Sequence, residues 1–170
     1  MKVNEWVDER RDFWKATEGA VAKLKYNYSV LDDWLLAIAA YNCGLGRMQR
    51  TIRASGINDF WELADRGLLP KQTIHYIPRF LAISRIMMYS GREKVSDSWN
   101  EPVRWERVRL KDSVSVSRLA AKASIPAETI RKANPELNYD ITPPGKYNYY
   151  LKVPEGKGGD IVKALSDSKN

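Results

Sequence analysis

Residues 35–46 read Leu-Leu-Ala-Ile-Ala-Ala-Tyr-Asn-Cys-Gly-Leu-Gly, an apolar run that ends in a tyrosine–asparagine pair and two glycines. The apolar half predicts a buried helix. Tyr41 and Asn42 then lie where the core ends, and Gly44 and Gly46 allow a sharp turn and the close approach of another molecule. The residues alone leave two interpretations open: the edge of a binding site, or a well-capped core helix.

The sequence around this run predicts a mainly helical region. Apolar residues at helical spacing, with capping residues before them, predict helices over 17–28, 34–41, the stretch after Gly46, 58–63 and 70–89. Asp32 or Asp33 should cap the second of these, and Asn58 the fourth. Pro70 is tolerated in a first turn, whereas Pro78 inside the last helix should kink or split it.

A different pattern begins after residues 91–103, which are polar and predict a linker. Alternating residues over 105–110 predict a strand. Two short helices should begin near Ser115 and Pro126, and a second strand should cover 147–153. This order gives a small βααβ unit. Residues 156–170 are rich in glycine, serine and charge, and we expect them to form a flexible tail.

The net charge is +7, from 28 basic and 21 acidic residues that are spread along the chain. This charge suits any polyanion, but no basic–aromatic alternation or recognition helix favours nucleic acid. One cysteine rules out an internal disulfide, and with one histidine it argues against a metal site. No run approaches ~18 apolar residues, so we expect no membrane span, and residues 1–15 do not read as a signal peptide.

Three ordered motifs resemble those of lytic transglycosylases with a goose-lysozyme-like (SLT) domain. The segment Ala40-Tyr41-Asn42-Cys43-Gly44 resembles the family's Ala-Tyr-Asn-x-Gly motif. Residues 6–12 resemble the segment that leads into the middle of that domain, and residues 69–80 resemble its late tyrosine motif. The resemblance covers roughly residues 4 to 90 and is strongest to the membrane-bound type D enzymes.

The resemblance also implies a missing part. In that family a catalytic glutamate, in a Glu-Ser motif followed by Gly-Leu-x-Gln, precedes the Trp-Val-Asp-Glu-Arg segment, and this chain has neither motif. We therefore expect a lytic transglycosylase domain without its first catalytic part. Such a core should leave the helix over 34–41 partly exposed and favour a homodimer or a complementing chain.

The resemblance implies a role for five residues. Tyr76 would orient the catalytic acid. Tyr41 and Asn42 would line the cleft, Gly44 would keep its wall low, and Gln72 would bind substrate where the family commonly has a glutamate. Neither a metal nor another cofactor is implied.

Two other residues invite a catalytic role. Glu9 lies beside Arg10 and Arg11, which favour its charged form, so it is a poor proton donor and more typical of a structural ion-pair cluster. His75 is compatible with a proton relay or with a plain helix-surface position.

The implied reaction opens the β-1,4 bond between N-acetylmuramic acid and N-acetylglucosamine in peptidoglycan. One glutamic acid protonates the leaving oxygen and then acts as base for the sugar's own 6-hydroxyl, which closes a 1,6-anhydro ring without water. A periplasmic or cell-envelope location follows for the parent protein. The alternative is a non-catalytic protein that binds peptidoglycan or a related glycan.

The βααβ unit resembles a LysM domain. Residues 124–135 match its second helix and Asn-Pro end, and residues 142–147 resemble the Thr-Pro-Pro turn of the repeat found in type D enzymes. Asp112 and the serines after it stand at the family's Gly-Asp-Thr/Ser segment, without its glycine. The predicted organisation is a lysozyme-like part over 1–92, a linker over 93–103, a LysM-like module over 104–155 and a tail over 156–170.

Overall fold

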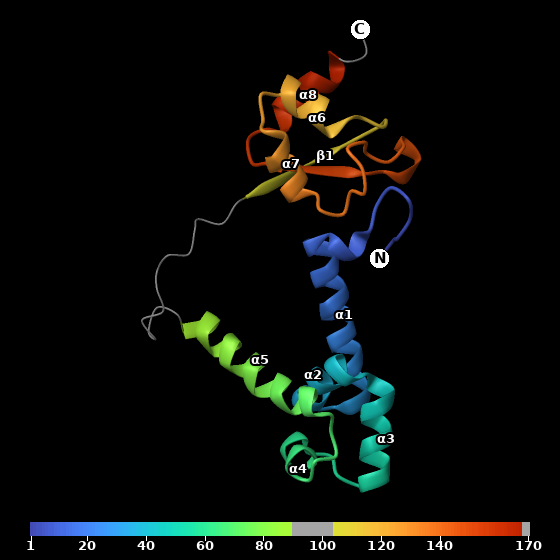
Figure 1. The fold of residues 1–170 in the computed structure, drawn as a ribbon, viewed down its shortest axis with the longest axis vertical. Helices are drawn as coiled ribbons and strands as arrows, with labels where there is room; N and C mark the ends of the chain where they lie inside the picture. The colour runs from blue at the N-terminus through green and yellow to red at the C-terminus, as the bar shows by residue number, and fades with distance from the viewer. Residues whose placement is uncertain (90–103, 168–170) are drawn as a thin grey trace. The chain divides into compact units, whose positions relative to one another are not determined.

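The computed structural model describes residues 1–89 and 104–167 (Figure 1). The described residues form two compact units, each with its own core. One unit, here called the helical unit, begins at Glu18 and runs to Tyr89. The other, here called the LysM-like unit, joins Met1–Thr17 to the chain from residue 104 onward. The predicted linker over 93–103 lies outside the described residues.

The helical unit is built around one apolar helix. Its elements are α1 (Phe13–Leu31), whose first residues belong to the other unit, α2 (Trp34–Cys43), α3 (Leu45–Ser55), α4 (Phe60–Asp65) and α5 (Lys71–Tyr89) (Figure 1). Helix α2 contacts α3, α4 and α5. Residues 36–40 are apolar on every side of α2 and all are buried, so the neighbouring helices must surround it.

Side-chain caps fix where these helices begin. Asp33 accepts a hydrogen bond from the Leu36 amide at 2.7 Å and so caps α2, as predicted. Asp59 caps α4 by accepting from the Glu62 amide at 2.8 Å, so the prediction of Asn58 was wrong by one residue. Both candidates are capping residue types, and only the path of the chain distinguishes them.

Helix α5 continues through Pro78 and is not split. Thr73 and Ile77 are buried on the face that packs in the core, whereas Pro78 itself is exposed. The packed face therefore holds the helix together although proline removes one backbone hydrogen bond.

The predicted partial exposure of the central helix is found at its two ends and not in its middle. Leu36, Ala37, Ala39 and Ala40 are fully buried, and only Trp34 and Tyr41 at the two ends of α2 are exposed. In the part of the chain that the structure describes, α3, α4 and α5 cover the middle of α2.

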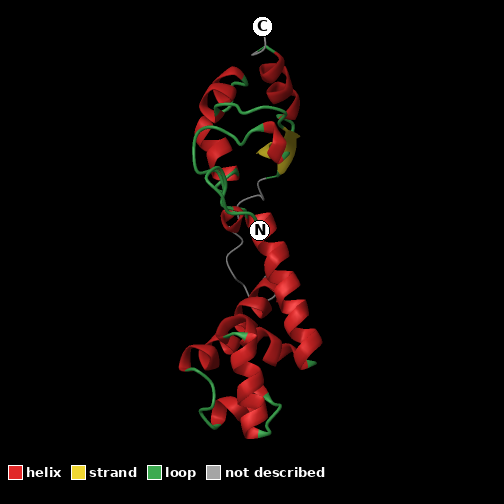
Figure 2. Cartoon of the chain, turned by 90° about the vertical axis from the view of Figure 1, so that its right-hand side faces the viewer, coloured by secondary structure: helices red, strands yellow, loops and turns green. Residues whose placement is uncertain are grey.

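The LysM-like unit has the predicted βααβ order. Its elements are β1 (Trp105–Arg109), α6 (Val116–Lys122), α7 (Ala127–Ala133), β2 (Tyr150–Pro154) and α8 (Gly158–Ser166) (Figure 1). Figure 2 colours the helices red and the strands yellow. The strands pair antiparallel with Val108 opposite Leu151. Strand β2 begins later than predicted, because Gly145–Tyr147 form a 3-10 turn and Asn148 has a left-handed backbone with φ 49°.

Helix α8 replaces most of the predicted flexible tail over 156–170. Ile161 and Ala164 are buried in the same core as Leu151 and Val153, and α8 contacts α6 and β1. The glycines and charges that suggested disorder lie on the exposed side of the helix and at its start, whereas its apolar residues recur at helical spacing.

We predict that Ile161→Ala destabilises the protein by about 2–5 kcal/mol, because it removes a fully buried side chain. Val162→Ala, on the exposed side of the same helix, should change the free energy of unfolding by less than about 0.5 kcal/mol. Urea unfolding followed by circular dichroism measures both. Equal, small effects would show that α8 contributes nothing to the core.

Candidate functional site

The candidate cleft residues lie where α2 ends and α5 begins. The Thr73 hydroxyl donates a hydrogen bond to Asn42 Oδ1 at 2.9 Å, and Thr73 is only 1% exposed. This bond fixes the Asn42 amide against α5. Sequence reasoning missed Thr73, although its place four residues before the buried Ile77 puts both on one face of α5.

Gly44 makes the turn at this edge. Its amide caps α2 by donating to the Ala40 carbonyl at 2.9 Å, and α3 begins at the next residue. Its φ of +90° strains any residue with a side chain. Nothing lies within 4 Å of the position a Cβ would take, so the surface is open here. Gly46 lies inside α3 and takes no part in the turn.

The remaining predicted site residues flank the bond between Asn42 and Thr73. Tyr41 and Gln72, their neighbours in sequence, are both exposed. Tyr76 is one turn further along α5, half-buried against the core, with its ring stacked on Phe80 at 6.4 Å between centroids. The structure thus joins α2 and α5 through Asn42 and Thr73, and Tyr41, Gln72 and Tyr76 lie within one turn of this bond along their helices.

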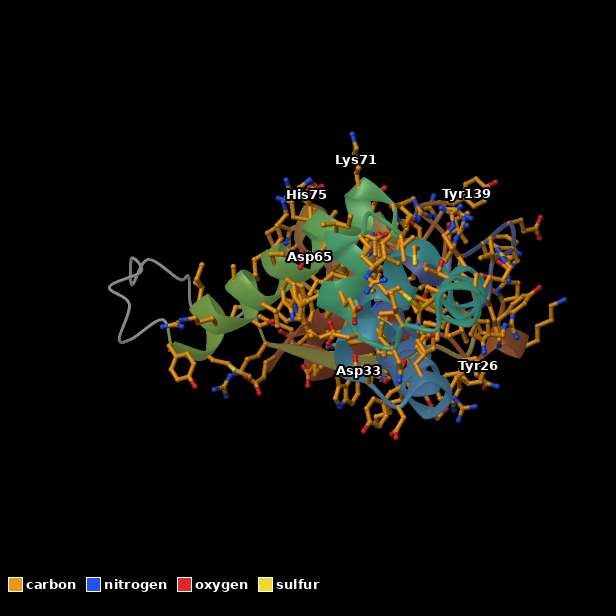
Figure 3. The ribbon with its side chains drawn as sticks, turned by 90° about the horizontal axis from the view of Figure 1, so that it is seen from below. Tyr26, Asp33, Asp65, Lys71, His75 and Tyr139 are labelled. Carbon is orange, nitrogen blue, oxygen red and sulfur yellow. The ribbon has the colours of Figure 1, made fainter. Side chains whose placement is uncertain are left out.

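His75 and Cys43 lie near these residues, and neither has the features of a catalytic group. His75 is exposed on α5, and Figure 3 shows the Lys71 side chain of the same helix extending away from the ribbon. Cys43 is half-buried, and burial raises the pKa of its thiol, which therefore stays protonated at neutral pH. A protonated thiol is a poor nucleophile, in agreement with the sequence.

Glu9 is held in its ionised form. Burial raises the pKa of Glu9, but hydrogen bonds from Lys15 and the Lys2 amide, each at 2.5 Å, outweigh burial and lower it. Next to it, a hydrogen bond from Arg10 lowers the pKa of Asp8 to about 2. Both carboxylates belong to ion pairs, which disfavours either as a proton donor.

A second candidate site lies in the LysM-like unit. A surface pocket of ≈ 300 Å³ is lined by residues of α7 and the loop after it, together with Val116. Asp140 at its rim accepts hydrogen bonds from Ser115 at 2.8 Å, Ser117 at 2.6 Å and Arg131 at 2.8 Å. Sequence reasoning missed Asp140, because its partners are distant along the chain.

These hydrogen bonds keep Asp140 charged. Burial raises its pKa, but the bonds from Ser117, Arg131 and Ser115 outweigh burial and hold the pKa well below its usual range. The carboxylate thereby ties the start of α6 to α7 and to the loop that follows it.

Comparisons with known proteins match both units. The Transglycosylase SLT domain family matches residues 1–64, and the LysM-like domain of lytic transglycosylase MltD matches residues 104–170. The chain is 33% identical over 175 aligned residues to "Membrane-bound lytic murein transglycosylase D" of Escherichia coli K12, and equally to that of Escherichia coli O6:H1.

The chain is similar to lytic transglycosylases in both of its matched segments. The similarity to the Escherichia coli enzymes covers 99% of this chain and 38% of theirs. The chain therefore spans less than half the length of these lytic transglycosylases. Within the described residues, no helix is both long and apolar enough to span a membrane.

We predict that Gly44→Ala destabilises the helical unit by about 1–2 kcal/mol, because alanine disfavours a φ of +90°. Gly46→Ala is the matched control. It lies inside α3, where a Cβ would meet only the end of Arg50 at 3.6 Å, and it should be neutral or stabilise by about 0.5–1 kcal/mol. Thermal unfolding of the two variants measures the difference. Equal shifts would contradict the role given to the turn.

We predict that Asp140 contributes to stability above pH ~4, the usual carboxyl pKa, and that this contribution is lost as the pH falls through its lowered folded-state pKa. The urea midpoint should therefore fall less between pH 6 and pH 3 in Asp140→Asn than in the natural chain. Glu128→Gln, which removes an exposed carboxylate paired with Lys132, serves as control and should behave as the natural chain does. An unchanged pH dependence in Asp140→Asn would refute this role.

Proposed function

We propose that the chain is part of a peptidoglycan lytic transglycosylase, which cleaves the bond between N-acetylmuramic acid and N-acetylglucosamine and forms 1,6-anhydro-N-acetylmuramic acid. The observation that carries the proposal is the hydrogen bond between Asn42 and Thr73, which joins the two helices that carry the motif residues. The matches to the transglycosylase and LysM-like families support it.

The geometry gives each residue a task in this proposal. Thr73 occupies Asn42 Oδ1, which leaves the Asn42 Nδ2 group to donate to a sugar hydroxyl or acetamido oxygen. Tyr41 is 42% exposed, and its ring offers an apolar face for a pyranose ring. Gln72 adds a second amide, and the open surface at Gly44 lets the glycan approach the backbone.

Tyr76 would be the positioning residue for the general acid. Its ring is held by the core and by Phe80, so its hydroxyl has a fixed place from which to donate to a carboxyl group. No residue of this chain stands at the family's Glu-Ser motif. We therefore propose that the acid comes from a segment outside these 170 residues, in the same polypeptide or in a complementing chain.

The proposed reaction also implies a substrate and a cellular location. The substrate would be the glycan strands of peptidoglycan, so the protein would act in the periplasm or cell envelope. The net charge of +7 would attract the anionic wall.

Incubation of the purified chain with peptidoglycan sacculi tests this function. If the chain supplies only part of the cleft, we expect it to pellet with sacculi and to release no 1,6-anhydro-muropeptides detectable by mass spectrometry. Release of these products would show activity in the chain itself, and Tyr76→Phe should then slow it by a factor of ten or more. Failure to pellet together with absence of products would contradict both the enzymatic and the glycan-binding readings.

Paired aromatic variants locate the binding surface. Tyr41→Ala should weaken pelleting by roughly five-fold or more, because a stacking ring contributes about 1 kcal/mol or more. Trp61→Ala removes a similarly exposed ring from α4 of the same unit and should leave pelleting unchanged. An equal loss in both variants would move the site away from Tyr41.

A further inference from the structure

A buried lysine lies in the middle of strand β2. Lys152 is only 2% exposed, whereas Leu151 and Val153 on either side of it point into the core of the LysM-like unit. Because side chains alternate along a strand, Lys152 points to the opposite face of the sheet. The ammonium group lies 5.7 Å from the ring centres of Phe13 and Trp14, so the first turn of α1 covers this face.

Two carboxylates neutralise the Lys152 ammonium. It donates to Glu136 Oε1 at 2.6 Å and to Asp12 Oδ2 at 2.9 Å, and both carboxylates are buried. Glu136 belongs to the loop after α7, and the Tyr149 hydroxyl donates to it at 2.8 Å. Asp12 comes from the opposite end of the sequence. Lys152 therefore joins the two parts of the LysM-like unit, the chain from residue 104 onward and the first residues of the sequence.

Asp12 uses both of its carboxylate oxygens. Oδ1 caps α1 by accepting from the amides of Trp14 at 3.0 Å and Lys15 at 3.2 Å, and Oδ2 accepts from Lys152. An asparagine here has a single oxygen, so it can cap the helix or meet the lysine, but not both. Burial raises the pKa of Asp12, but the bonds from Lys152 and these amides outweigh burial and lower it.

The backbone of the loop over 136–138 is also occupied by residues near the N-terminus. The Asp8 amide donates to the Glu136 carbonyl at 2.8 Å, and the Asn138 amide donates to the Trp6 carbonyl at 3.0 Å. The Asn138 side chain donates to the carbonyls of Asn4 at 3.1 Å and Glu5 at 2.9 Å. These pairings form a short antiparallel contact around Val7 and Leu137.

We propose that the part of the LysM-like unit over 104–167 is a docking domain for residues 4–14, which lie in the segment that matches the SLT family, and that Lys152 is the charge that fixes them. While these residues are docked, the Glu136 carbonyl and the amides of Leu137 and Asn138 are paired within the chain and are not available to a glycan. The unit then fastens the transglycosylase segment and does not bind sugar through this loop. This inference does not depend on the proposed activity.

The physical argument is the cost of an unpaired buried charge. Removing one partner of a buried ion pair is much more destabilising than removing an exposed pair, because the remaining charge stays without water. Arg107 strengthens the same contact, since its guanidinium lies 4.5 Å from the ring centre of Trp14. The buried Lys152 is therefore stable only while residues 12–14 pack over it, because they supply the Asp12 carboxylate and the two covering rings.

Amide hydrogen exchange followed by NMR on the full chain tests the docking. In the natural chain the amides of Asp8 and Asn138 should be protected. Asp12→Asn should speed their exchange by at least ten-fold more than it speeds the exchange of the β2 amides from Leu151 to Val153. Asn138→Ala, an exposed substitution outside the core, should have the same selective effect.

Glu128→Gln removes a carboxylate from an exposed pair of the same unit and should leave these amides protected. Fast exchange of the Asp8 and Asn138 amides in the natural chain would overturn the proposal. So would exchange that is accelerated equally in β2, or exchange at Asp8 and Asn138 that is accelerated in neither Asp12→Asn nor Asn138→Ala. Addition of chito-hexaose gives an independent test. If it shifts the amides of residues 136–138 in the natural chain while Asp8 stays protected, the loop binds glycan when docked and the proposal fails.

Discussion

The helical unit depends on the burial of α2. A helix with apolar side chains all around it is stable in water only when other elements cover every side. Residues 36–40 impose this requirement, and α3, α4 and α5 satisfy it. The candidate cleft is a consequence, because α2 ends at the boundary of the core and brings Asn42 against Thr73 of α5. The side chains of Asn42 and Thr73 are therefore positioned by two packed helices and not by a loop.

A buried charge imposes the corresponding constraint on the LysM-like unit. Lys152 takes part in the sheet, yet its side chain lies on the face that the core helices do not cover. Its burial requires carboxylates and a covering segment, which Asp12 and Glu136 and the first turn of α1 provide. Such clusters contribute specificity more dependably than stability, because desolvation offsets much of the attraction. Here the specificity is for one particular segment of the same chain.

The two compact units do not coincide with the segments that the family comparisons match. The residues that match the SLT family are split between the two units, since residues 1–17 pack with the LysM-like unit and the rest of the match lies in the helical unit. The contacts therefore group residues 1–17 with the C-terminal part of the chain, whereas the SLT match includes them in the transglycosylase segment. Helix α1 belongs to both units, so the LysM-like unit is built partly from the segment that a sequence motif assigns to the transglycosylase.

The sequence by itself determined the class of the fold and the family resemblance. Apolar spacing located α2 and α5, strand alternation located β1, and the Ala-Tyr-Asn-Cys-Gly segment pointed to the candidate cleft. These features are local, because a helix or a strand shows its buried face within a few turns. The sequence did not determine the cap of α4, the packing of α8, or the partners of Asn42, Asp140 and Lys152. The cap of α4 is local, and the path of the chain selects Asp59 over Asn58. The packing of α8 and the three sets of partners depend on groups far apart in the chain, which only tertiary structure brings into contact. Lys152 shows the reason most clearly: a lysine in a strand is expected to face water, and only a covering segment from the other end of the chain, carrying Asp12, makes its burial possible.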